Sequence, residues 1–139
     1  MKTRAGILTL ALLGSVVLAA PALAGWGGGE ETPTLGVGQS YTTVLTAPTT
    51  YHTFHFSSWA SGATFLVTTY QTDYSLAGDD TVIRAIKSDN TGYLLDDDAG
   101  PQSYSQAVFE RRGVYEWVDV RSYNSSDLQN TKVVITRLK

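Results

Sequence analysis

The stretch DDTVIRAIKSDNTGYLLDDDAG, from Asp79 to Gly100, decides the fold. It contains two runs rich in β-branched and large apolar residues, 80–87 and 92–95, separated by an Asn-Thr-Gly turn signal at 90–92. Short runs of this kind, bounded by Asn, Asp and Gly, are typical of β-strands. The stretch therefore predicts a strand–turn–strand unit with acidic residues at both of its ends.

The same pattern continues on both sides of this unit. From Ser40 onward Thr, Val, Tyr, Phe and Ile dominate, and no segment has a convincing helical period. The predicted strands are 41–46, 51–57, 63–70, 80–87, 92–95, 104–110, 113–121 and 131–138. About eight short antiparallel strands, with turn signals about every ten residues, predict an all-β fold. The expected architecture is an antiparallel two-sheet β-sandwich of jelly-roll type.

Alternation along two of these strands indicates which side chains face the core. Phe54 and Phe56 share one face of their strand with His52, because successive side chains of a strand point to opposite faces. In the strand 80–87, Arg84 is the residue least suited to burial. The opposite face, which carries Ile83, is therefore the predicted core face.

The strand 113–121 is ambiguous in this respect. Tyr115 and Trp117 share one face, whereas Val118 and Val120 share the other. A β-bulge near Val118 would let both pairs contribute to one core. We therefore expect both aromatic residues to be core residues, together with Phe65.

The N-terminal segment predicts export. Lys2 and Arg4 give a basic start, residues 7–20 are apolar, and 22–24 (Ala-Leu-Ala) has the small-x-small pattern of a signal peptidase site. The apolar run is shorter than the roughly 20 residues of a membrane span. We expect a secreted protein, extracellular or periplasmic. The expected division of the chain is a signal peptide (1–24), a flexible Gly-rich arm (25–39) and a β-sandwich domain (40–139).

Charge and cysteine content limit the classes of function. The formal net charge is −3, and Lys2 and Arg4 both belong to the predicted leader, so the mature chain is more acidic still. This argues against a nucleic acid or an anionic membrane as partner, because both require basic patches. The chain has no cysteine. The exported domain must therefore rely on its apolar core, with a metal as a further source of stability.

Five segments match a known family pattern in order and spacing. They are the aromatic strand YHTFHF, the segment DDTVIRAI, the acidic turn in NTGYLLDDDAG, a serine at position 103 or 105, and the strand GVYEWVDV. With these segments the chain, from about Tyr51 to Leu138, resembles the bacterial pre-peptidase C-terminal domain family, a β-sandwich module common in secreted proteases. Two features depart from the family: we expect no catalytic domain within these 139 residues, and one extra residue precedes Val120.

The resemblance implies a calcium site. Members of this family, and the similar collagen-binding modules of bacterial collagenases, often bind Ca²⁺ through aspartates at the D-T and D-D positions. The implied ligands are Asp80, Asp97 and Asp98, with Asp79, Asp96, Glu30 and Glu31 as further candidates if the arm folds over the site. The chemistry agrees, because Ca²⁺ binds six to eight oxygens. The alternative is a solvated acidic turn, since two carboxylates about 5 Å apart in water repel by only ~1 kcal/mol.

Other candidate sites are less specific. His52 and His55 lie on opposite faces of one predicted strand and cannot bind one metal from it. No G-x-S-x-G motif is present, but a carboxylate pair for glycoside hydrolysis remains an alternative. Exposed aromatic side chains could bind a sugar or a protein. The candidates for this role are Trp59, Tyr70, Tyr74, Tyr104 and Tyr123.

These observations predict a secreted, non-enzymatic module, stabilised by calcium, for binding or adhesion to an extracellular protein or carbohydrate. A first alternative is a structural subunit of an extracellular assembly or filament, joined by the arm or by an edge strand through β-augmentation. A second alternative is a small secreted hydrolase.

Overall fold

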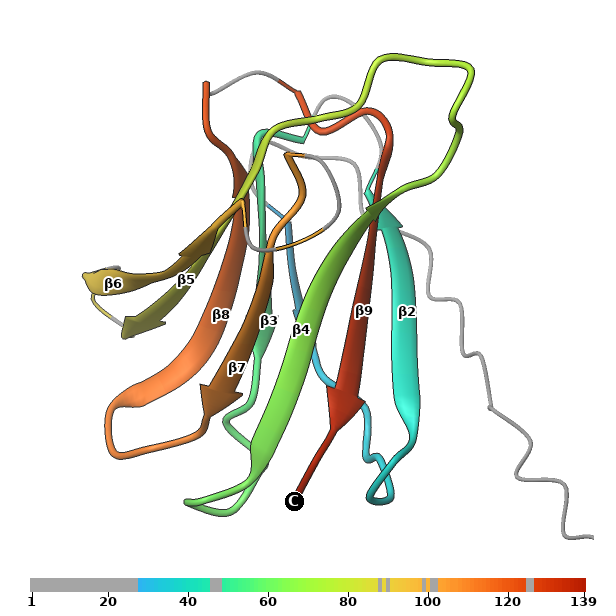
Figure 1. Cartoon of the computed structure of the whole chain (residues 1–139). Helices are drawn as coiled ribbons and strands as arrows, with labels where there is room; N and C mark the ends of the chain where they lie inside the picture. The colour runs from blue at the N-terminus through green and yellow to red at the C-terminus, as the bar shows by residue number, and fades with distance from the viewer. Residues whose placement is uncertain are drawn as a thin grey trace, which may run out of the picture.

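A computed structural model describes residues 28–45, 49–87, 89, 91–98, 100, 103–124 and 127–139. The predicted signal peptide lies outside these residues. Within them, nine strands form two sheets that face each other (Figure 1). The described part of the chain contains no helix that is long and apolar enough to cross a bilayer.

The sheets differ in size. The five-stranded sheet consists, in order, of β1 (Gly28–Glu31), β3 (Tyr51–His55), β8 (Tyr115–Ser122), β5 (Thr81–Lys87) and β6 (Gly92–Asp97). The four-stranded sheet consists, in order, of β2 (Ser40–Leu45), β9 (Thr131–Arg137), β4 (Thr64–Gln71) and β7 (Gln106–Glu110). All neighbouring strands are antiparallel except β1, which is parallel to β3.

The strand order is that of a jelly roll. Apart from β1, the first strand pairs with the last: β2 with β9, then β3 with β8, β4 with β7, and β5 with β6. This nested pairing is what a long hairpin produces when it wraps around a core. The predicted all-β antiparallel sandwich is confirmed, and the stretch 79–100 forms its innermost hairpin.

Both sheets contribute to one core. Phe54 and Ile83 of the five-stranded sheet and Phe65 of the four-stranded sheet are fully buried, as is Phe56. The Phe56 ring packs against Phe65 and Phe109, with centroid distances of 4.6 and 5.0 Å. The predicted core positions Phe54, Phe56, Phe65 and Ile83 are therefore confirmed.

A β-bulge decides which face of β8 enters the core. The register of β8 against β5 shifts by one residue at Glu116. Because of this shift, Tyr115 packs against the core on the same side as the fully buried Val118. Trp117 instead stacks on His55, with a centroid distance of 4.7 Å, on the outer face. The prediction of Trp117 as a core residue is wrong. The bulge lies between Tyr115 and Trp117, so it turns the Tyr115 side chain toward the core and leaves Trp117 on the outer face.

The segment predicted to be a flexible arm belongs to the sandwich from Gly28 onward. Residues 28–31 pair with β3, and Leu35 is buried in the core. The Glu30 carboxylate accepts a hydrogen bond from Tyr41 Oη at 2.6 Å and lies 3.1 Å from His52 Nε2. Burial, together with the Glu30 carboxylate, raises the pKa of Tyr41. These contacts hold a Gly-rich strand that its own composition does not favour.

Candidate metal centre

The β5–β6 hairpin brings three aspartates together. Asp80 immediately precedes β5, Asp97 is the last residue of β6, and Asp98 follows it. Because the strands are antiparallel, the start of β5 lies beside the end of β6, as the pairing of Val82 with Asp97 shows. One carboxylate oxygen from each aspartate lies within 4.8 Å of the other two. In Figure 1 the tip of the β6 arrow lies beside the start of β5.

This spacing suits a single cation. Two oxygens that each lie about 2.4 Å from one Ca²⁺ can be at most ~4.8 Å apart. Three carboxylates supply about three to six of the six to eight oxygens that Ca²⁺ takes, which leaves positions for water or carbonyl oxygens. The acidic cluster of Asp80, Asp97 and Asp98 can therefore bind a metal, and a donor set made only of oxygens favours a hard cation.

The three carboxylates repel one another. Partial burial, followed by the negative charges of Asp98 and Asp97, raises the pKa of Asp80. Asp98 has a φ of 91° and is the one non-glycine residue of the described ranges with a positive φ. Such a conformation is uncommon for residues other than glycine, although aspartate tolerates it better than most. A bound cation would relieve the repulsion.

A buried hydroxyl network fixes the backbone beside Asp80. The Ser105 backbone N–H donates to the hydroxyl oxygens of Thr69 and Thr81, at 2.8 and 3.1 Å, and Ser105 Oγ donates to the Thr81 carbonyl. All three side chains are buried. Because Thr81 follows Asp80 directly, the network positions the residue that carries the first carboxylate. Of the two serines that the family pattern allowed, Ser105 is the one in this network, whereas Ser103 contributes a backbone carbonyl to the Thr81 N–H.

Asp79 and Asp96 serve the fold and do not join the cluster. Asp79 Oδ2 accepts hydrogen bonds from the Asn130 backbone N–H at 2.8 Å and from Thr131 Oγ1 at 2.6 Å. Asp96 Oδ2 accepts one from the Gln106 backbone N–H at 2.8 Å, which links β6 to β7. Neither belongs to the group of three aspartates, although the sequence predicts both as further ligands. Asp96 and Asp97 are consecutive residues of β6, so their side chains point to opposite faces of the sheet.

Glu30 and Glu31 lie at the far edge of the five-stranded sheet. In the order β1-β3-β8-β5-β6, their strand and β6 are the two outermost strands. Glu30 contacts Tyr41 and His52, as described above, and Glu31 Oε1 lies 3.5 Å from His55 Nδ1. The expectation that these glutamates reach the acidic cluster is wrong, because pairing with β3 holds them on the opposite side.

Two of the aromatic candidates for ligand binding are buried or partly buried. Tyr104 is buried, and its hydroxyl donates to the Asn130 carbonyl at 3.0 Å. Trp59 packs edge-on against Phe65, with a centroid distance of 5.0 Å. The prediction that Tyr104 is exposed is therefore wrong, whereas Trp59 is partly buried against the core.

The remaining aromatic candidates differ in exposure. Tyr70 is half-buried below Lys132, whose Nζ lies 5.3 Å from the ring centroid. Tyr74 and Tyr123 are 75% and 61% exposed. Sequence reasoning also missed Tyr93, which is 50% exposed on β6. Exposure alone therefore does not single out one of these tyrosines as a binding residue.

Comparison with solved structures shows a similarity of fold. No family model matches the chain, and no curated protein matches it at a significant level. The fold is similar to the crystal structure of the pre-peptidase C-terminal domain of a collagenase from Bacillus anthracis. The sequences are 10% identical, the match covers 85% of this chain and 97% of that chain, and the TM-score is 0.43. That domain bears the name of the family that the sequence motifs resemble.

Proposed function

We propose that the mature protein is a secreted, non-enzymatic binding or adhesion module whose sandwich is stabilised by calcium at Asp80, Asp97 and Asp98. The observation that carries the proposal is the convergence of these three carboxylates at the ends of two paired strands. The predicted signal peptide supports export. Extracellular modules bind Ca²⁺ with dissociation constants of about 10⁻⁴ to 10⁻³ M, which suits that environment.

Calcium would act here on stability. Its ligands would come from the start of β5 and the end of β6, so that the ion joins two strand ends that otherwise repel. An ion that binds the folded chain but not the unfolded chain stabilises the fold by mass action. With a dissociation constant near 0.1 mM, about 2 mM calcium would contribute roughly 1.8 kcal/mol.

The first prediction concerns thermal stability. We expect about 2 mM calcium to raise the melting temperature by several degrees relative to a chelator, given that contribution of roughly 1.8 kcal/mol. Magnesium should raise it much less, because it dehydrates reluctantly and demands a tighter octahedron. Asp98→Asn should remove most of the calcium response and cost little in chelator, since it also relieves repulsion.

The matched control is Asp89→Asn. Asp89 lies in the turn of the same hairpin and accepts hydrogen bonds from Thr91, outside the cluster. This variant should keep the full calcium response. Identical melting curves of the wild-type protein in calcium and in chelator, with no heat on calorimetric titration, would reduce the cluster to a solvated acidic turn.

A further inference from the structure

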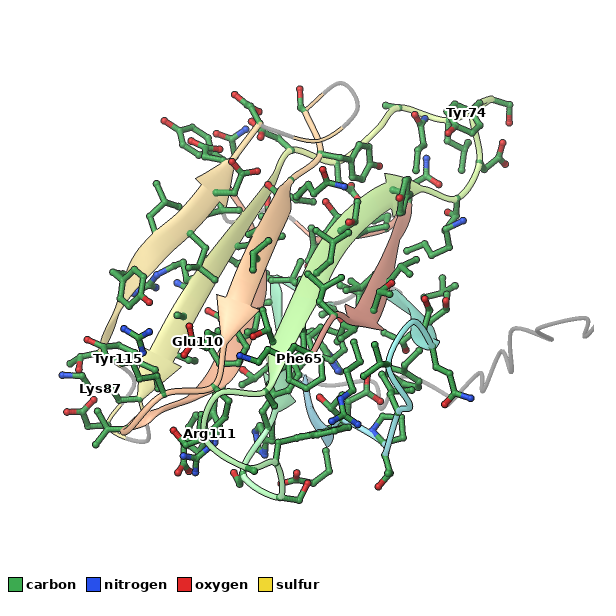
Figure 2. All side chains as sticks on the ribbon, turned by 60° about the horizontal axis from the view of Figure 1, so that its bottom comes forward. Phe65, Tyr74, Lys87, Glu110, Arg111 and Tyr115 are labelled. Atoms are coloured by element: carbon green, nitrogen blue, oxygen red, sulfur yellow. The ribbon has the colours of Figure 1, made fainter. Side chains whose placement is uncertain are left out.

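A cleft of about 360 Å³ lies at the opposite end of the β5–β6 hairpin from the acidic cluster. Its lining residues are Tyr93, Val108, Glu110, Arg112 and Tyr115. Small-molecule sites have volumes of roughly 300–1,000 Å³, so the cleft falls within this range. Figure 2 shows Lys87, Glu110 and Tyr115 close together at one end of the molecule, with Tyr74 at the other end.

The cleft is built on a tight connection between the two sheets. β7 and β8 belong to different sheets, and they are joined by a turn in which the Tyr115 N–H donates to the Arg112 carbonyl at 3.0 Å. Gly113 has a φ of 56° in this turn, a conformation that suits glycine. The turn therefore leads from one sheet to the other and places Arg112 and Tyr115 beside each other.

Tyr93 provides an aromatic surface in the cleft. Its ring meets the Tyr115 ring in a T-shaped contact, with a centroid distance of 5.0 Å and an interplanar angle of 74°. Lys87 Nζ lies 5.3 Å from the centroid of the Tyr115 ring, in a cation–π contact. Tyr93 is nevertheless 50% exposed. A tyrosine ring held in this way offers a rigid apolar contact at low entropic cost.

An ion pair provides polar groups beside the ring. Arg112 Nη2 lies 3.1 Å from both carboxylate oxygens of Glu110, and the two side chains are 75% and 42% exposed. An ion pair this exposed contributes little to stability. It does, however, present carboxylate acceptors and guanidinium donors next to each other. The cleft thus combines an apolar ring with paired donors and acceptors.

We propose that this cleft binds a saccharide, with the face of one sugar ring on Tyr93 and its hydroxyl groups hydrogen-bonded to Glu110 and Arg112. A pyranose has C–H groups on its faces and hydroxyls around its rim, and each hydroxyl both donates and accepts. A proline-rich peptide would use the aromatic ring, but it has few donors for the carboxylate. The proposal rests on the binding-module function and names the ligand class and site.

The test is a binding assay with wild-type protein and variants. Pull-down on insoluble cellulose, chitin, mannan and peptidoglycan should retain the wild-type protein on at least one of them. Tyr93→Ala should weaken that binding at least about tenfold by removing the aromatic contact. Glu110→Gln, which removes charge-assisted hydrogen bonds at constant size, should weaken it about fivefold. Tyr51→Ala is the matched control, because it removes a partly exposed tyrosine on β3 that does not line the cleft, and it should bind as wild type does.

Melting curves of each variant separate lost binding from lost folding. Failure of all four polysaccharides to retain the wild-type protein would overturn the proposal, and so would wild-type binding by folded Tyr93→Ala. Retention only on an immobilised proline-rich peptide would replace the saccharide with a protein ligand and would leave the binding-module function intact. The calcium response is measured without any polysaccharide, so its absence would contradict the calcium site alone.

Discussion

Phe54→Ala is expected to lower the free energy of unfolding by about 3–5 kcal/mol. Phe54 is fully buried on the inner face of β3, and its ring lies 4.9 Å from that of His52. Hydrogen-bonded strands flank it on both sides, β1 and β8, so the cavity left by the ring cannot close by local collapse. The loss is a large part of the roughly 5–15 kcal/mol that stabilises a typical domain. Denaturant unfolding of the wild-type protein and the variant would measure it.

The control for this prediction lies on the same strand. Tyr51 is 37% exposed on the outer face of β3, where its ring contacts the guanidinium of Arg121. Tyr51→Ala should lower the free energy of unfolding by less than about 1 kcal/mol. Equal losses for Phe54→Ala and Tyr51→Ala would show that the inner and outer faces of β3 have been assigned wrongly.

Gly92→Ala should have the next largest effect on the free energy of unfolding and should also disturb the acidic cluster. A Cβ at position 92 would lie 2.1 Å from the Ala85 carbonyl oxygen and 2.9 Å from the Ile86 Cα. Both contacts are with backbone, so β6 must move away from β5. We expect a loss of about 2–3 kcal/mol in the free energy of unfolding. Because Asp97 and Asp98 stand at the other end of the displaced strand, the calcium response should shrink as well.

Leu94→Ala tests whether the effect of Gly92→Ala comes from the backbone clash. Leu94 is on the same strand and is 56% exposed. Its truncation should change the free energy of unfolding by no more than about 0.5 kcal/mol and should leave the calcium response intact. An undiminished calcium response in Gly92→Ala, measured by thermal melting, would show that β6 does not hold the cluster in place.

The fold was predictable because its signals are local. Runs of β-branched and aromatic residues, closed by Gly, Asn and Asp, gave eight strands whose bounds lie close to those of β2 to β9. β1 was missed because the sequence of Gly28–Glu31 does not favour a strand by itself. Its position depends on partners distant in sequence, Tyr41 and His52, which hold Glu30 between the sheets.

The acidic cluster was predictable for the same reason. Asp80, Asp97 and Asp98 converge through one hairpin, so a turn signal was enough to place them together. Asp79 and Asp96 could not be separated from them by composition, because their partners, Asn130 and Gln106, are set by the tertiary fold.

The exposure of Tyr93 was hidden by a further irregularity. The register of β6 against β5 shifts between Ile83 and Arg84, where Leu95 is the extra residue of β6. Simple alternation therefore loses its phase along β6. A sequence pattern gives no sign of such a shift. Counting alternate residues from one end of β6 therefore assigns side chains at the other end to the wrong face of the sheet.

The pairing of β2 with β9 has a consequence for the order of folding. It joins Ser40–Leu45 to Thr131–Arg137, so the four-stranded sheet cannot close until the last strand has been synthesised. Non-local pairing of this kind carries a large loop-closure entropy, and β-sandwiches accordingly fold in about milliseconds to seconds. Until then both edges of β2 are open to neighbouring chains, because β9 is its one partner in the described sheet. The β5–β6 hairpin is the most local of the nested pairs, so we expect the strands that carry the acidic cluster to pair before the outer strands do.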